Sequence, residues 1–317
     1  MADKTRASQK PRSVTKRPPK LPSNGSGAAP RLDVRKTYKL FIGGAFPRSE
    51  SGRSYPVTGP GGGLLAHAAL ASRKDARDAV VAARKAVAGW AGATAYNRGQ
   101  VLYRVAELLE GRSGQFAAEI AQSEGAGAEQ ARQSVAEVID RWVWYAGWPD
   151  KVAQVAGGAN PVAGPYFNFT VPEPTGVVAV IAPAEAGLLG LVSVLAPVIA
   201  TGNTAVVVAG GAAALPAVTL SEVLATSDVP AGVVNVLTGR TAELAPVLAA
   251  HMDVNAIDLT GAAGPDRAEL ERMAAGNVKR VFAAGADWSP EDWAAAPGPA
   301  RLLAFLETKT VWHPIGI

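Results

Sequence analysis

Apolar residues recur at helical spacing through the first half of the chain. A short apolar stretch at 38–46, with paired glycines at its reversal, predicts a strand and a turn. Ser72 and Asp75 then form a capping-box pattern, so a helix is expected over 73–88 with an alanine- and valine-rich face turned inward. The same period predicts further helices at 97–110, 113–123 and 127–147.

The pattern changes at 151–174. Val152 to Ala156 and the stretch from Tyr166 to Val171 are interpreted as two extended segments around the turn Gly157-Gly158. They predict a protruding hairpin. Because an isolated two-stranded ribbon is only marginally stable in water, we expect this hairpin to need a partner surface.

From Gly176 onward, short apolar strands alternate with helices. Such alternation predicts an α/β fold with a Rossmann-like, doubly wound parallel sheet and helices on both faces. In sheets of this kind, ligands bind at the carboxyl ends of the strands. The expected strands are 177–182, 204–208, 233–237, 256–259 and 279–282, and the expected helices are 188–199, 215–226, 243–251 and 265–274.

Composition narrows the chemistry. Hydrophobic residues make up 48% of the 317 residues and charged residues 18%, which is enough apolar material for a sizeable core. The chain contains no cysteine, which excludes disulfides, thiolate metal sites and thiol nucleophiles within it. The three histidines lack ligand spacing, so no metal site is expected. No membrane-spanning run or secretory signal is recognised, and a cytoplasmic location without membrane association is expected.

Charge divides unevenly along the chain. Residues 1–36 carry ten Lys and Arg against two Asp, a net charge of +8, while the remaining 281 residues carry 21 basic and 25 acidic residues, a net charge of −4. This basic tail nearly lacks large apolar side chains and is expected to be disordered. It is either a solubilising extension or an arm for an acidic partner or nucleic acid. No aromatic residue is interleaved with the basic ones, which disfavours nucleic acid.

Several motifs, in this order, resemble those of the aldehyde dehydrogenase superfamily. The resemblance runs over about 38–282 and returns near the chain end. It implies a Rossmann-like domain for NAD(P), a cysteine nucleophile, a glutamate base, an oxyanion-hole asparagine, and a hairpin and C-terminal strand that form an oligomerisation sheet. The motifs are FIGGAF at 41–46, DAVVAAR at 78–84, EPTGVVAVIAP at 173–183, ATGNT at 200–204, PAGVVNVLTG at 230–239, DLTG at 258–261 and ETKTVW at 307–312.

At the positions matching the family's catalytic and ribose-binding motifs, this sequence departs from the pattern. The motif that carries the oxyanion asparagine begins at Pro183, and Glu185 stands at the asparagine position, where a carboxylate opposes developing negative charge. The lysine and glutamate that grip the adenosine ribose correspond to Val208 and Gly211.

The motif near the cofactor pyrophosphate keeps Gly261 but has Ala262 in place of serine and Asp266 in place of glycine. The motif at 230–239 keeps its final glycine, Gly239. The general base corresponds to an alanine within 284–287. The resemblance therefore implies a degenerate cofactor site, so no cofactor is expected and NAD(P) is retained only as a residual ligand.

The expected organisation is a basic tail at 1–36, a cofactor domain at 37–282 with its oligomerisation hairpin at about 151–174, a connector at 283–306 in place of the thiol-bearing domain, and a C-terminal oligomerisation strand at 307–317. The residues expected to form the oligomerisation surface are Tyr166, Phe167, Phe169, Val171, Lys309, Val311 and Trp312.

Three functions remain open. The first is a non-catalytic structural or regulatory subunit whose partner is an aldehyde dehydrogenase-family protomer, either a second copy or a full-length enzyme. For this function, the missing domain is expected to uncover an apolar flank of the cofactor domain. The second is a residual NAD(P)-binding oxidoreductase acting on aldehydes, and the third is binding of an acidic partner or nucleic acid through the tail.

Overall fold

The computed structural model describes residues 34–262, 264–283 and 292–316. The chain divides into two units, Met1–Arg35 and Lys36–Ile317, and the second contains every element discussed below. The expectation of a disordered tail concerns residues that lie almost entirely outside the described ranges. Among the described residues, no helix combines the length and the apolar composition that a membrane crossing requires.

A five-stranded parallel sheet forms the centre of the second unit, which confirms the predicted doubly wound fold. Its strand order is β10-β9-β6-β7-β8, so the chain starts in the middle of the sheet and builds outward to both edges. All five strands lie close to their predicted positions. Their bounds are β6 Val177–Ile181, β7 Thr204–Ala209, β8 Val234–Thr238, β9 Ala256–Asp258 and β10 Arg280–Phe282.

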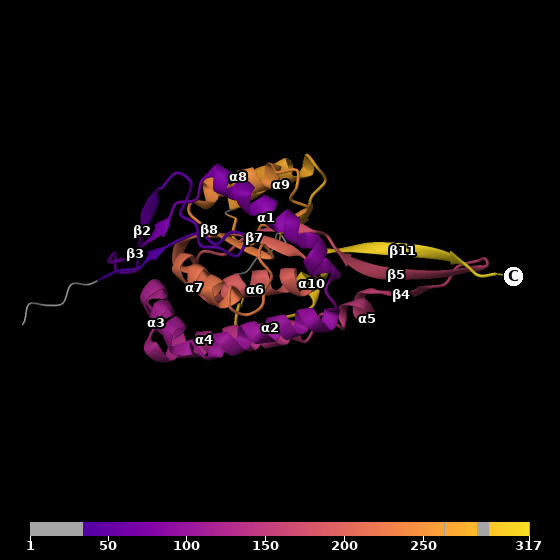
Figure 1. Cartoon of the computed structure of the whole chain (residues 1–317), viewed down its shortest axis with the longest axis horizontal. Coiled ribbons are helices and arrows are strands. Elements are labelled where there is room, and N and C mark those ends of the chain that lie inside the picture. Colours follow the sequence, from indigo (N-terminus) through magenta and orange to yellow (C-terminus); the bar gives the residue numbers. More distant parts are fainter. Residues whose placement is uncertain (1–33, 263, 284–291, 317) are drawn as a thin grey trace, which may run out of the picture. The chain divides into compact units, whose positions relative to one another are not determined.

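Helices cover both faces of this sheet (Figure 1). One face packs against α1 Arg73–Gly92, α8 Thr241–Ala250 and α9 Gly264–Ala275. The other face packs against α6 Gly187–Ala200 and α7 Ala214–Leu224, and α7 follows the 3-10 turn η1 Gly211–Ala213. An outer layer beyond them contains α2 Ala95–Glu110, α3 Ser113–Glu124 and α4 Ala128–Ala146.

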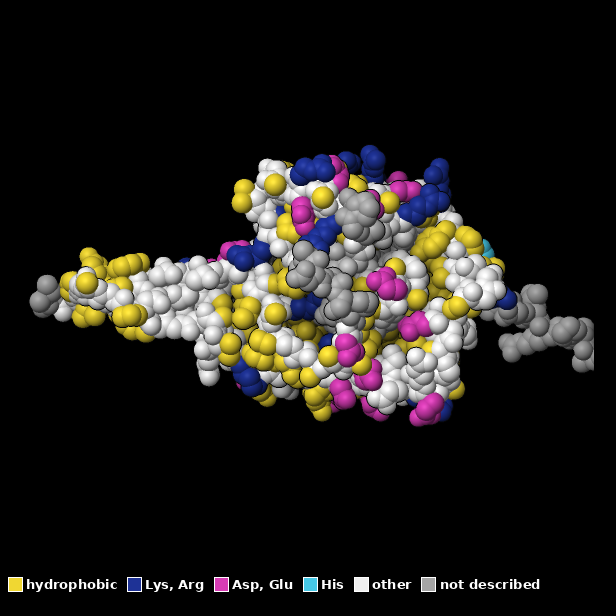
Figure 2. All heavy atoms as spheres, turned by 180° about the vertical axis from the view of Figure 1, so that it is seen from behind, with side chains coloured by type: hydrophobic (Ala, Val, Ile, Leu, Met, Phe, Trp, Pro, Cys, Tyr) yellow, Lys and Arg dark blue, Asp and Glu magenta, His cyan; other side chains and the backbone are white. Residues whose placement is uncertain are grey.

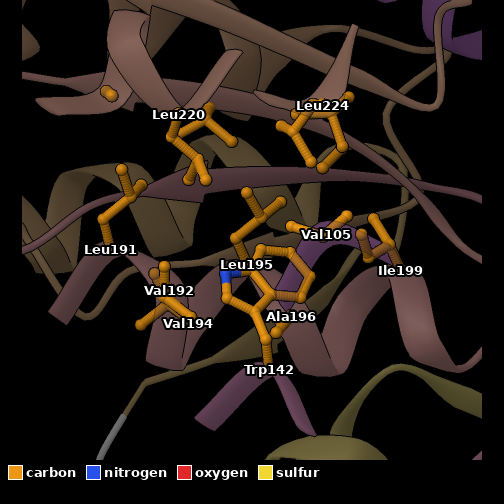
Figure 3. Packing of buried hydrophobic residues seen from close by; sticks show 14 of the residues in the cluster. Val105, Trp142, Leu191, Val192, Val194, Leu195, Ala196, Ile199, Leu220 and Leu224 are labelled. Atoms are coloured by element: carbon orange, nitrogen blue, oxygen red, sulfur yellow. The ribbon is translucent and has the colours of Figure 1, made fainter. Parts of the chain in front are cut away.

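Helix α6 is buried on every side because it lies between the sheet and the outer helices. All fourteen of its residues are buried, which matches its uninterrupted apolar sequence. Trp142 of α4 is fully buried and packs against this helix, as Figure 3 shows with Leu191, Leu195 and Ile199 around it. This two-sided core holds the carboxyl ends of the strands in fixed positions.

The helix starts agree with the predicted capping chemistry. Ser72 accepts hydrogen bonds from the backbone of Lys74 and Asp75, and the Asp75 side chain accepts one from Ser72 N at 2.8 Å, so the capping box is complete. The turn at Gly43 and Gly44 is also as predicted, since both residues adopt positive φ angles of 59° and 79°.

A small sheet near the start of the unit was not predicted. It contains β1 Thr37–Tyr38, β2 Ser54–Thr58 and β3 Leu64–Ala69 in the order β1-β3-β2. Its strands are short and only partly buried, so their apolar pattern is weak.

A second small sheet, antiparallel throughout and here called the ribbon, has the strand order β11-β5-β4 and extends away from the central sheet (Figure 1). It contains β4 Gly158–Asn160, β5 Tyr166–Pro174 and β11 Leu306–Pro314. Strand β11 pairs with β5 along nine residues, from Leu306 opposite Pro174 to Pro314 opposite Tyr166. The prediction that the C-terminal strand joins the hairpin is therefore confirmed.

One part of the hairpin prediction was wrong. Val152–Ala156 is not extended but forms the short helix α5. The Trp148 carbonyl accepts hydrogen bonds from the backbone of Lys151 and Val152, so the chain leaves α4 through helical turns and becomes extended only after Gly157. A five-residue segment with apolar residues on either side of Gln154 fits either period, and the local backbone hydrogen bonds decided the outcome.

Candidate functional site

The carboxyl ends of the parallel strands bring most of the predicted cofactor-site residues to one edge. Pro183 and Glu185 follow β6, Gly211 follows β7, Gly239 follows β8, and Gly261 with Ala262 follows β9. Neighbouring loops are joined directly, since Ala212 N donates to Ala184 O at 3.2 Å and Gly261 N donates to Ile181 O at 2.9 Å. Ligands of such sheets bind at this edge.

Two predicted residues differ in burial. Val208 lies in β7 with its side chain fully buried in the layer beneath α1 and α8, where it touches core residues rather than the edge loops. Glu185 lies in the exposed turn before α6. Val208 therefore provides no polar side chain for the ribose contact that the resemblance implies at this position.

Gly261 is required by the backbone itself. A Cβ atom at this position would lie 2.1 Å from Ala182 O and 2.7 Å from Ile181 O, so no side chain fits without moving β6. Gly211 is similarly confined, because its φ angle is 55° and a Cβ atom there would lie 3.0 Å from the Cβ of Ala184. These glycines are explained by close packing of the loops.

A pocket of about 330 Å³ opens between α8 and α9 beside Gly261 and Ala262. Its walls are mainly apolar, from Ala245, Pro246 and Leu270, but Asp266 and Glu269 also line it. A dinucleotide would bring two phosphate charges to this edge, and carboxylates repel them. The lining thus fits an apolar ring better than it fits a pyrophosphate.

The turn that leads into α6 packs against a carboxylate from another helix. Glu124, at the end of α3, lies against Gly187, where a Cβ atom would come within 1.7 Å of its Oε1. Burial raises the pKa of the Glu124 carboxyl, and a hydrogen bond with the Leu188 backbone N–H partly offsets that rise. Glu124 therefore lies against the first turn of α6, and Gly187 provides the space.

The position expected for a general base, 284–287, lies outside the described residues, so its surroundings are not described. The last part of the connector is described, and it covers part of the flank that was expected to be exposed. Trp293, Leu302 and Phe305 pack into the core beside α4 and α6, with Leu302 and Phe305 at most 1% exposed. The flank next to these residues is covered by the chain itself.

The ribbon carries the predicted oligomerisation residues on two faces. By register, Phe167, Phe169 and Val171 share one face with Lys309 and Val311, and the two phenyl rings lie 5.4 Å apart. Both faces bear exposed apolar side chains. Figure 2 shows one side of the ribbon, where apolar side chains gather toward the end far from the central sheet.

On the opposite face, the aromatic pair Tyr166 and Trp312 packs edge to face at 5.8 Å, with the two residues 43% and 59% exposed. Closer to the body, this face is polar and internally satisfied. Asn160 Nδ2 donates to Asn168 Oδ1 at 2.6 Å and to Thr170 Oγ1 at 2.8 Å. Polar groups so paired gain little from a partner, whereas the exposed aromatic rings remain in water.

The outer edge of β11 adds a second feature. Within the described part of the chain, β11 pairs only with β5, so one nine-residue edge presents backbone groups without a strand partner. The charged pair Lys309–Glu173, at 2.8 Å, lies across the β5–β11 interface. A long edge of this kind is a template for adding another strand.

Comparison with known proteins agrees with these features. Residues 46–286 match the model of the aldehyde dehydrogenase family. The chain is 32% identical over 247 residues to benzaldehyde dehydrogenase, mitochondrial, of Antirrhinum majus, covering 77% of this chain and 46% of that protein. It is also 32% identical over 257 residues to human retinal dehydrogenase 2, covering 80% of this chain and 49% of the relative.

Solved structures give the same result. The NAD⁺ complex of an aldehyde dehydrogenase from Bacillus cereus superposes with a TM-score of 0.74 at 27% identity, over 78% of this chain and 50% of the other. An NAD-dependent aldehyde dehydrogenase from Sinorhizobium meliloti gives 0.74 at 28% identity, over 80% and 50%. The chain thus spans about half the length of these relatives. It belongs to the aldehyde dehydrogenase family.

Proposed function

We propose that this chain is a non-catalytic subunit that assembles through the ribbon with an aldehyde dehydrogenase-family protomer, either a second copy or a full-length enzyme. The observation that carries the proposal is the ribbon itself. It exposes aromatic side chains on both faces and a long β edge, neither of which the fold of the central sheet requires.

The residues of this chain support the part of the proposal that says it does not catalyse aldehyde oxidation. The chain contains no cysteine to attack an aldehyde, and Glu185 stands where resemblance implies an oxyanion-hole asparagine. Loss of a covalent nucleophile alone costs roughly a million-fold in turnover in a serine protease. Purified chain that reduced NAD⁺ in the presence of an aldehyde would contradict this part of the proposal.

Assembly is tested by light scattering on the purified chain, alone and mixed with a full-length aldehyde dehydrogenase from the same source. We expect a stable complex in one of the two samples. The double variant Phe167→Ser with Trp312→Ser should lose it, because an exposed aromatic anchor is removed from each face of the ribbon.

Tyr103→Ser is the matched control, since Tyr103 is 49% exposed on α2 and lies outside the ribbon. A chain that stays monomeric and captures no enzyme would refute the proposed assembly. So would a double variant that assembles as well as the unmodified chain.

A residual nucleotide-binding role is the second candidate, favoured by the apolar pocket between α8 and α9. Calorimetry with NAD⁺, NADP⁺ and adenosine tests it. The carboxylates of Asp266 and Glu269 predict that the charged dinucleotides bind no better than adenosine. Micromolar binding of NAD⁺ would instead favour this second role.

A further inference from the structure

The described end of the connector, residues 292–305 and here called the strap, is bound to the body by two buried arginines. The first is Arg141 of α4, which is 8% exposed. Its guanidinium donates to Ser193 Oγ at 3.0 Å, to Trp293 O at 2.6 Å and to Ala295 O at 3.0 Å. One side chain thus ties α4 and α6 to the backbone at the beginning of the strap.

The second is Arg301, which belongs to the short helix α10 Ala300–Ala304 within the strap. Its guanidinium donates to Asp258 Oδ2 and to Thr260 Oγ1, both at 3.1 Å. The two charged side chains are only 10% and 1% exposed. The Arg301 guanidinium also lies 4.8 Å from the centre of the Phe282 ring and 5.6 Å from that of Trp293. The cation is therefore held by a carboxylate, a hydroxyl and aromatic faces.

The strap leads directly into the ribbon. The Phe305 carbonyl accepts hydrogen bonds from Asn203 Nδ2 at 2.9 Å and from Thr175 N at 3.2 Å. Arg280 then donates to both carboxylate oxygens of Glu307, at 3.0 and 2.7 Å. Arg301 is thus bound to β9, Phe305 to the residue before β7, and Glu307 to β10. Strand β11 continues from this fixed segment.

We propose that the strap positions β11, and that Arg301 is a positioning residue on which assembly through the ribbon depends. The inference rests on the proposed function, but it concerns residues that lie outside the exposed ribbon surface. Removing one partner of an ion pair this deeply buried is destabilising, because the remaining charge loses one of its compensating partners while it stays shielded from water. Loss of Arg301 would therefore displace α10, and with it the beginning of β11.

Arg301→Met tests the inference, because methionine removes the charge and keeps an apolar stem. Native-state hydrogen exchange should become about tenfold faster or more in β11 and β5, while β6, β7 and β8 keep their protection. The affinity of assembly should fall by about tenfold, because ordering the ribbon would then oppose binding. Arg301→Lys should recover part of both effects through its remaining charge.

Arg104→Met is the matched control. Arg104 pairs with Glu107 at 3.2 Å on the exposed surface of α2, and its loss should leave exchange and assembly unchanged. If Arg301→Met does not fold, Asp258→Asn tests the same pair, since asparagine has nearly the same shape and removes the carboxylate charge that faces the guanidinium. This variant should accelerate exchange in the same two strands.

Unchanged exchange in β11 would overturn the inference. Equal acceleration in β6, β7 and β8 would also overturn it, because it would indicate general destabilisation. The failure of the proposed function is recognised separately: the double variant Phe167→Ser with Trp312→Ser would then assemble normally, whatever the exchange in Arg301→Met.

Discussion

The edge of the central sheet and the ribbon differ in what their residues are needed for. At the sheet edge, the small residues are explained by the fold, since Gly261 has a backbone carbonyl 2.1 Å from where a Cβ atom would lie. In the ribbon, the exposed rings of Phe167 and Trp312 are not needed to fold the central sheet. A residue that packing requires gives little information about a ligand, whereas the exposure of these aromatic rings requires another explanation.

The same contrast applies to charge. The pocket between α8 and α9 is lined by Asp266 and Glu269, which oppose the phosphates of a dinucleotide. Glu269 is itself paired with Arg272 on α9, and at the base of the ribbon both carboxylates are paired, Glu173 with Lys309 and Glu307 with Arg280. The fold of a cofactor domain is thus retained at an edge whose pocket carries acidic side chains, while the ribbon is apolar at its exposed end.

The largest expected effect is a difference in the free energy of unfolding between alanine variants of two tryptophans. Trp142→Ala should lower the free energy of unfolding by about 3–5 kcal/mol, because Trp142 is fully buried against α6 and its loss leaves a cavity. Trp312→Ala should change it by less than about 1 kcal/mol, since that ring is 59% exposed, yet should weaken assembly. Denaturant unfolding and light scattering measure both. Equal losses of stability would erase the contrast between core and ribbon.

A smaller effect tests whether the sheet edge is shaped by packing. Gly261→Ala should lower the free energy of unfolding by about 1–3 kcal/mol, because its Cβ atom would collide with the end of β6. Gly89→Ala is the matched change: it lies in α1 with no atom within 4 Å of the added Cβ, and should raise stability by about 0.5–1 kcal/mol. A tolerated Gly261→Ala would mean that packing does not require this glycine.

The smallest effect is a pH dependence at the opposite edge of the sheet. Burial lowers the pKa of Lys279 from 10.5 to about 8, and the side chain donates to Asn277 Oδ1. Between these two pH values the unfolded chain binds more protons than the folded chain, so the stability contributed by this site rises with pH. Below pH 8, both states are protonated and the burial penalty is complete.

Lys279→Met should therefore remove this rise and stabilise the chain most at neutral pH. Thermal unfolding of the variant and the unmodified chain from pH 7 to pH 10.5 measures the difference. Lys85→Met, at an exposed position of α1, should keep the unmodified slope. An identical slope in Lys279→Met would show that burial of this ammonium does not govern the dependence.

Much of the fold could be predicted because its signals are local. The capping box at Ser72, the helical period of α1 to α4 and the apolar strands β6 to β10 all lie within short windows, and each was found close to its predicted place. The failure at Val152–Ala156 has the same origin, because five residues are too few to distinguish the two periods. The partly buried strands β2 and β3 were missed for lack of a clear pattern.

The sequence by itself determined that the chain has no thiol, that its central sheet is parallel, and which side chains the ribbon carries. Only the tertiary structure decided which polar side chains contact which parts of the fold. Arg301 donates a hydrogen bond to Asp258, 43 positions away, and Glu124 lies against the first turn of α6. Periodicity records which face of an element is buried. It contains no information about which polar group lies opposite another, because that depends on how the separate elements pack.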